Sequence, residues 1–173
     1  MKKVIFLCAI AVLAFSACQQ DPVRYTQDSP EIDTVKQLVS NYNSKSYDTS
    51  MYADTSQTFY NTINNPMSPS EAMEFHKQTD QNYASRGFGG DNMEYEMVIT
   101  DDGETWVNCW LGWKGTLAAN NKDIYIPIHL TYQFVDGKIV REYGYWDGSQ
   151  VMMELQKIEA EAKMAEEEME PME

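Results

Sequence analysis

Residues 124–147, with the sequence IYIPIHLTYQFVDGKIVREYGYWD, decide how this 173-residue chain folds. Two runs rich in β-branched and aromatic residues flank Asp136-Gly137, a dipeptide typical of a two-residue type I′ turn. The pattern therefore predicts an antiparallel hairpin with strands over residues 124–135 and 138–146. Pro127 has no backbone N–H to donate, so it marks an edge position or a bulge where the first strand bends.

The two-residue turn sets a register for this hairpin, with Val135 opposite Lys138 and the pairs counted outward from there. On that register Glu142 and His129 lie on one face of the hairpin. A turn with a bulge would instead shift the pairs by one residue. The other face is apolar and aromatic, with Asp147 at its far end, and it includes Ile126, Ile128, Leu130, Tyr132, Tyr143 and Tyr145.

Upstream of the hairpin, the sequence predicts helices and then further strands. Ser29-Pro30-Glu31 is a helix start, with a cap residue, a proline at the first helical position and an acid in the first turn. Ser68-Pro69-Ser70-Glu71 is a capping box that opens a second helix, to about Tyr83. Alternation predicts strands over residues 93–99 and 105–114, so the chain is expected to form helices followed by an antiparallel meander.

His76 shares the apolar face of the second predicted helix with Phe75 and Thr79. Two interpretations of this histidine stay open. It is either a half-buried side chain with a backbone partner or a polar contact for a ligand.

The first 17 residues have the pattern of a secretory signal peptide. A positive start precedes an apolar run over residues 4–15, which is too short to span a bilayer as a helix. Phe15-Ser16-Ala17-Cys18 is similar to a bacterial lipobox, which predicts cleavage before Cys18 and lipidation of the cysteine; an ordinary signal peptide with a chance cysteine is the alternative. Gln19 favours the outer membrane of a diderm bacterium, and residues 18–28 are expected to act as a polar tether.

Composition argues against several kinds of partner and ligand. The net charge of -14, from 27 acidic and 13 basic side chains, argues against binding to nucleic acid or to an anionic membrane surface. After processing, Cys109 would be the remaining thiol, so no internal disulfide is expected. Two histidines far apart and one cysteine give no zinc spacing, and we expect no metal and no cofactor.

The last segment, residues 149–169, predicts a helix with apolar residues at heptad spacing. Its first half is expected to dock on the domain through Val151, Leu155 and Ile158. Residues 159–173 are dense in glutamate and are expected to form an acidic helical tail. A dimerising coiled coil is the alternative.

The segments Asp136-Gly137-Lys138-Ile139-Val140 and Tyr145-Trp146-Asp147 resemble the last two strands of the nuclear transport factor 2-like superfamily, and within it the SnoaL-like branch. Residues 39–54 are similar to the family's first helical pair. The resemblance implies an α+β domain over residues 29–158. In it, a cone-shaped barrel is made of a strongly curved antiparallel sheet wrapped around N-terminal helices, with a C-terminal helix. It also implies a pocket for a small, largely apolar ligand, with Ile126, Ile128, Leu130, Tyr132 and Tyr145 in its wall.

In SnoaL-like cyclases an aspartate on the last strand is the general acid/base, and the resemblance places Asp147 at the matching position. Such a carboxyl group needs an apolar surround, which raises its pKa towards the working pH. His76 and Tyr143 are the other candidate catalytic residues. The segment Asp147-Gly148-Ser149-Gln150 equally fits the N-cap of the last helix, so both roles stay open.

Three functions follow from these observations. The first is a lipid-anchored domain of the cell envelope that binds a small apolar ligand, or a partner, in the cone pocket. The second is a general acid/base enzyme of the polyketide cyclase, isomerase or dehydratase kind that uses Asp147. The third is an assembly module, a homodimer formed through exposed Trp106, Trp110 or Trp113. We rank binding ahead of catalysis because the sequence shows no complete catalytic set, and a homodimer is compatible with either.

Overall fold

The computed structural model describes residues 23–91 and 93–169, so the predicted signal peptide and residues 18–22 of the tether, Cys18 among them, lie outside the described residues. The described chain is an α+β fold with a curved seven-stranded sheet. Its elements are β1 (Tyr25–Thr26), α2 (Pro30–Asn43), β2 (Tyr52–Tyr60), α3 (Pro69–Asp80), β3 (Tyr83–Phe88), β4 (Glu94–Ile99), β5 (Thr105–Leu117), β6 (Asp123–Val135), β7 (Lys138–Trp146) and α4 (Ser149–Met169).

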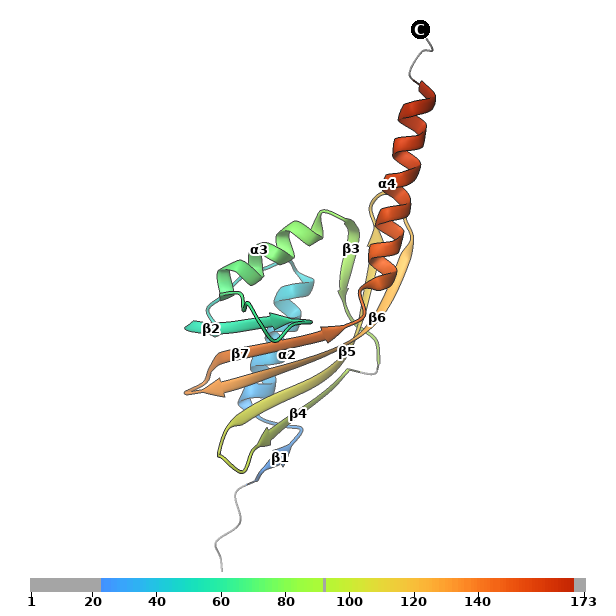
Figure 1. The fold of residues 1–173 in the computed structure, drawn as a ribbon. Helices are drawn as coiled ribbons and strands as arrows, with labels where there is room; N and C mark the ends of the chain where they lie inside the picture. Colours follow the sequence, from blue (N-terminus) through green and yellow to red (C-terminus); the bar gives the residue numbers. More distant parts are fainter. Residues whose placement is uncertain (1–22, 92, 170–173) are drawn as a thin grey trace, which may run out of the picture.

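The strands follow the order β1-β4-β5-β6-β7-β2, and β3 pairs with the later part of β5. All described pairs are antiparallel except β2 with β7, which is parallel. The sheet curves around α2, while α3 lies over β2 and α4 projects beyond the β5–β6 hairpin (Figure 1). This arrangement confirms the predicted fold class, with one parallel pair added to the expected antiparallel sheet.

The predicted register of the β6–β7 hairpin is correct at the turn and wrong beyond it. Asp136 and Gly137 both have positive φ (50° and 74°), as a type I′ turn requires, and Val135 pairs with Lys138. Phe134 then pairs with Ile139 and Gln133 with Arg141, which leaves Val140 as the extra residue of a bulge. From the bulge onward every β7 side chain lies on the face opposite to the predicted one.

The consequence of the bulge is an exchange of residues between the two faces. Glu142 pairs with Tyr132 and Gly144 with Leu130, so Glu142 lies on the concave, core side of the sheet. Tyr143 pairs with Thr131 and Tyr145 with His129 on the outer side.

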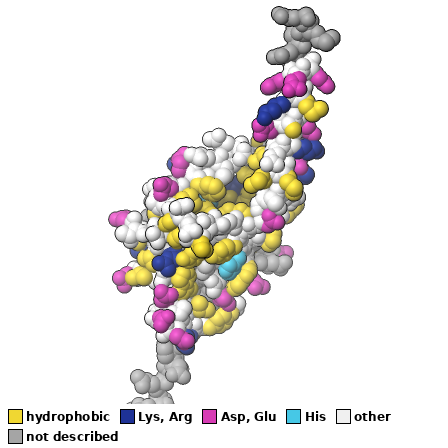
Figure 2. All heavy atoms as spheres, in the orientation of Figure 1, with side chains coloured by type: hydrophobic (Ala, Val, Ile, Leu, Met, Phe, Trp, Pro, Cys, Tyr) yellow, Lys and Arg dark blue, Asp and Glu magenta, His cyan; other side chains and the backbone are white. Residues whose placement is uncertain are grey.

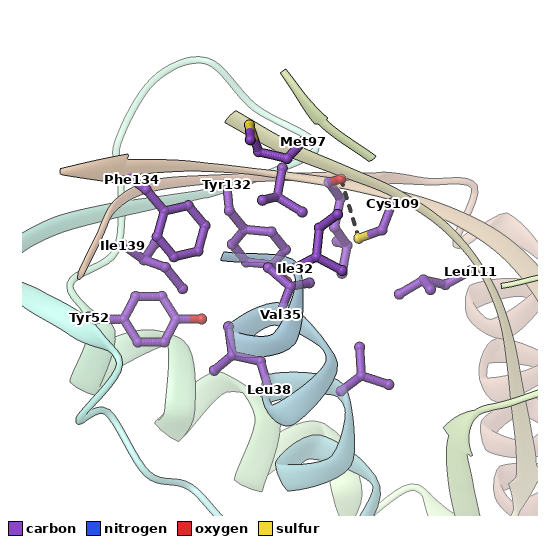
Figure 3. Packing of buried hydrophobic residues seen from close by; sticks show 13 residues of the cluster. Ile32, Val35, Leu38, Tyr52, Met97, Cys109, Leu111, Tyr132, Phe134 and Ile139 are labelled. Atoms are coloured by element: carbon purple, nitrogen blue, oxygen red, sulfur yellow. Dashed lines mark hydrogen bonds between the residues drawn. The ribbon is translucent and has the colours of Figure 1, made fainter. Parts of the chain in front are cut away.

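The main core lies between α2 and the concave face of the sheet. Ile32, Val35 and Leu38 of α2 point towards Tyr132, Phe134 and Ile139 (Figure 3). Ile32, Val35 and Ile139 have no exposed surface, so each contributes about 1.5–3 kcal/mol through burial of its side chain.

The two predicted helix starts are confirmed. Ser29 accepts a hydrogen bond from the Ile32 amide, and Ser68 forms a complete capping box with Glu71. The helix after Ser68 ends at Asp80 rather than near Tyr83, because residues from Tyr83 onward form β3.

Helix α4 is attached to the domain through its first half. Val151, Leu155 and Ile158 pack on the buried cluster around Trp113. Glu154 accepts hydrogen bonds from Asn120 and Lys122. The described side chains beyond residue 158 are exposed, and acidic groups are prominent along this part of α4 (Figure 2). Among the described helices, none is both long enough and apolar enough to cross a membrane.

Candidate functional site

A cavity of about 380 Å³ lies between the concave face of the sheet, α2, α3 and the start of α4. Hydrophobic side chains surround a hollow between α3 and the base of α4 (Figure 2). The volume falls in the range of small-molecule sites, which are mostly apolar with a few polar groups. The apolar and aromatic part of its wall includes Leu38, Tyr42, Met73, Phe75, Tyr83, Phe88, Trp113, Ile126, Ile128, Leu130, Trp146 and Leu155.

Glu142 is the buried carboxyl group of this cavity, with 3% of its surface exposed. Its Oε2 accepts hydrogen bonds from the hydroxyls of Tyr52 (2.9 Å) and Thr58 (3.2 Å), and its Oε1 accepts one from Tyr60 (3.2 Å). Burial raises the pKa of Glu142, while the hydroxyl donors, Tyr132 among them, oppose that rise. The charge of this carboxyl group therefore depends on two opposing effects, burial and the hydrogen bonds from the hydroxyls.

His76 is linked to Glu142 through Tyr60. The Nε2 atom of His76 lies 3.0 Å from the Tyr60 hydroxyl. Burial, and next the positive charge of Arg86, lower the pKa of His76 from 6.5 to about 4, so the imidazole is neutral near pH 7. A neutral imidazole can donate or accept at Nε2 according to its tautomer, so Glu142, Tyr60 and His76 form a chain through which a proton can pass.

An ion pair beside the cavity holds its rim in place. The Arg86 guanidinium donates to both carboxylate oxygens of Asp80, at 2.5 and 2.7 Å, and the Tyr47 hydroxyl donates to the same carboxylate. Arg86 also stacks on the Tyr42 ring, 3.7 Å from its centroid. Tyr42 in turn accepts a hydrogen bond from the Trp113 indole (2.9 Å). These contacts fix two tyrosines of the cavity wall against α3 and β3.

The structure brings together five of the residues predicted for the site and separates the other three. Tyr143 and Tyr145 do not line the cavity, because the bulge at Val140 turns them to the outer face of the sheet. Asp147 is exposed, and its Oδ1 accepts from the Ser149 amide (2.9 Å) at the start of α4. The five that do line the cavity are His76, Ile126, Ile128, Leu130 and Tyr132.

The position of Asp147 matches the capping interpretation better than the catalytic one. Hydrogen bonds from the Ser149 backbone and side chain lower the pKa of Asp147, and it does not line the cavity. A catalytic aspartate would instead need burial that raises its pKa. Its catalytic role stays a prediction without support from this geometry.

Sequence reasoning missed Glu142 and Tyr60. Both point into the cavity from neighbouring strands, β7 and β2, which pair in parallel. The signal for Glu142 is the alternation Glu142, Gly144, Trp146, which has the correct period once one residue of Ile139-Val140 is taken as the bulge.

Of the three tryptophans proposed for a dimer surface, Trp113 is not exposed. It is 6% exposed and lines the cavity. Trp106 and Trp110 lie on the outer face of the sheet. Trp110 is 44% exposed, and its ring centroid lies 5.0 Å from that of His129.

Within the described residues, no group of three or more histidine, cysteine, aspartate or glutamate side chains is arranged to hold a metal ion. The chemical groups of the cavity wall include the carboxyl groups of Glu142 and Asp48, the imidazole of His76 and several tyrosine hydroxyls.

No protein-family model and no curated protein matches the chain. Solved structures do match it in fold. An NTF2-like protein of unknown function from Burkholderia pseudomallei has a TM-score of 0.58 at 10% identity, with 73% of this chain and 97% of that chain covered.

Two further matches are candidate polyketide cyclases. The one from Xanthomonas campestris has a TM-score of 0.59 at 12% identity, covering 72% of this chain and 96% of its own. The SnoaL-like one from Jannaschia sp. has a TM-score of 0.55 at 14% identity, covering 78% and 94%. These likenesses show that the chain has the nuclear transport factor 2-like fold.

Proposed function

We propose that the protein binds a small, largely apolar molecule in the cavity formed by the sheet, α2, α3 and the start of α4. The observation that carries this proposal is an apolar and aromatic wall around about 380 Å³ that contains a hydrogen-bonded polar cluster of Tyr60, His76 and Glu142. That distribution suits a ligand with an apolar body and one polar end.

Binding is tested with N-phenyl-1-naphthylamine, an apolar dye whose fluorescence rises in apolar surroundings. Val151 lines the cavity from α4, so Val151→Trp should fill part of it and abolish the fluorescence gain. Met153, on the same helix turn but 62% exposed and outside the lining, provides the matched control, Met153→Trp. Equal dye binding by both variants would contradict cavity binding.

An acid/base reaction is the second candidate function, with Glu142 and His76 as its groups. The specific observation in its favour is the buried carboxyl of Glu142, joined through Tyr60 to a neutral imidazole. A base of this kind can take a proton from the carbon next to a carbonyl group, and the chain to His76 can redistribute that proton.

Catalysis is tested by proton exchange, which needs no knowledge of the natural substrate. A cyclic ketone such as 2-tetralone is incubated with the protein in D₂O, and loss of its α-protons is followed by proton NMR. Exchange that is faster than in buffer and lost in Glu142→Gln supports an enzyme. Exchange at the buffer rate leaves ligand binding as the function.

We further propose that the domain is attached to the outer membrane through lipid on Cys18. The support is the sequence of residues 1–19 alone. Labelling of growing cells with an alkynyl fatty acid should mark the protein, and Cys18→Ala should remove the label.

A further inference from the structure

The charged groups that line the cavity have one sign. Among the described residues that form its wall, Glu142 at the buried end and Asp48 at the exposed end are the charged side chains, and no lysine or arginine is present. A bound anion would therefore meet two carboxyl groups without a counter-charge, while a bound cation would be attracted by both.

Glu142 also has no cationic partner elsewhere in the described chain. The described salt bridges involve nine pairs, and none includes Glu142. Arg86 is the arginine near the cavity, but its side chain is fully buried outside the lining and is bound to Asp80. A buried carboxylate without a counter-ion is costly, and a positively charged ligand would remove that cost.

The aromatic rings of the wall add a second attraction for a cation. Tyr60 lies 5.7 Å from Phe75 and 5.3 Å from Trp146 between ring centroids, and Tyr83 lies 5.2 Å from Trp113. The face of an aromatic ring attracts a cation, most strongly where water is excluded. An alkylammonium group gains more from such a wall than a hydrated metal ion because its surface is apolar.

From the charges and rings together, we infer that the ligand of this cavity is a small organic cation, an amine or quaternary ammonium on an apolar body. The inference rests on the proposed ligand-binding function and names the chemical class that the same cavity selects. The ammonium group lies towards Glu142, and the apolar body lies along the rings and aliphatic side chains near the mouth.

The test compares three molecules of nearly the same shape and different charge. Choline has a positive charge on its branched head, and 3,3-dimethyl-1-butanol has the same shape without a charge. In 3,3-dimethylbutanoate the branched head is uncharged and the other end is a negative carboxylate. Each is titrated against dye-loaded purified protein in 150 mM salt, where the general attraction of an acidic protein for cations is screened. Choline should bind at least tenfold more tightly than the alcohol, and the carboxylate most weakly.

Two glutamine variants separate the cavity charge from the overall charge. Glu142→Gln should weaken choline binding at least tenfold and change the affinity for the alcohol by less than about twofold. Glu96 lies on the outer side of β4, bonded to Asn108, so Glu96→Gln removes one negative charge away from the cavity and should change neither affinity. If Glu142→Gln fails to fold, the order of the three affinities in the unaltered protein decides alone.

The outcomes distinguish this inference from the proposed function. If the alcohol displaces the dye as well as choline does, the inference is overturned while ligand binding in the cavity stands. If the dye itself does not bind to the cavity, both the inference and the proposed function are overturned.

Discussion

His76 should make the stability of this protein fall as the pH drops from 6.5 to 4. Its folded pKa of about 4 lies below the ordinary value of 6.5, first because burial disfavours the imidazolium and next because Arg86 is nearby. Between these two pH values the unfolded chain binds a proton that the folded chain does not. At about 1.4 kcal/mol for each pKa unit, the loss attributable to His76 is about 3 kcal/mol. The contribution is fully present above pH 6.5 and lost below pH 4.

The assay is urea unfolding of the unaltered protein and of His76→Gln at pH 7, 6, 5 and 4. The difference in unfolding free energy between the two cancels the titration of the many carboxylates, which both proteins share. This difference should change by about 3 kcal/mol across the range, in favour of the variant at low pH. His129→Gln, the same substitution on the outer face, is the control and should retain the fall because His76 is still present.

A difference that stays constant from pH 7 to pH 4 would refute the reasoning. It would mean that the imidazole binds a proton as readily in the folded chain as in the unfolded chain, and hence that His76 is not desolvated by the cavity wall.

Three further substitutions test the site and its neighbours. Glu142→Leu should lower the free energy of unfolding by about 3 kcal/mol in urea titrations, because the buried hydroxyls that donate to Glu142 would lose their acceptor. Glu142→Gln should lower the free energy of unfolding less, because the amide oxygen can still accept. Gly144→Ala should lower the free energy of unfolding by about 1–3 kcal/mol and weaken dye binding, because the new Cβ would lie 2.9 Å from Tyr60 Cδ1 and Trp146 Cζ3. An unchanged unfolding curve would show that the two rings shift freely. Asp147→Ala should lower the melting temperature by roughly 2–4 °C and Asp147→Asn leave it nearly unchanged, because only alanine lacks an acceptor for the Ser149 amide; equal curves for all three proteins would exclude capping.

Much of the fold could be predicted from local sequence because its signals are local. The caps at Ser29 and Ser68 depend on contacts within one helical turn, and the Asp136-Gly137 turn depends on two backbone angles. Strand β3 was missed because its sequence, YASRGF, has no clear alternation. Its pairing with β5 comes from the tertiary arrangement.

The candidate site could be predicted only in part, and one residue accounts for most of the difference. Ile139 and Val140 are both apolar, so hydropathy does not show which of them is the extra residue of a bulge. Counting without the bulge places Tyr143 in the cavity and Glu142 outside, the reverse of the arrangement in the structure. The inward residues of β6 were predicted correctly. This strand pairs with β5 without a bulge, so simple alternation along β6 gives the correct face for each residue.

The most direct test of ligand binding in the cavity is to soak crystals of the protein with 6-bromo-2-naphthol and solve the structure. Anomalous scattering then locates the bromine. We predict a bromine peak inside the cavity, beside Trp113 and Ile128, with the hydroxyl towards Tyr60. A peak confined to the outer face of the sheet, beside Trp110 and Tyr145, would contradict the account.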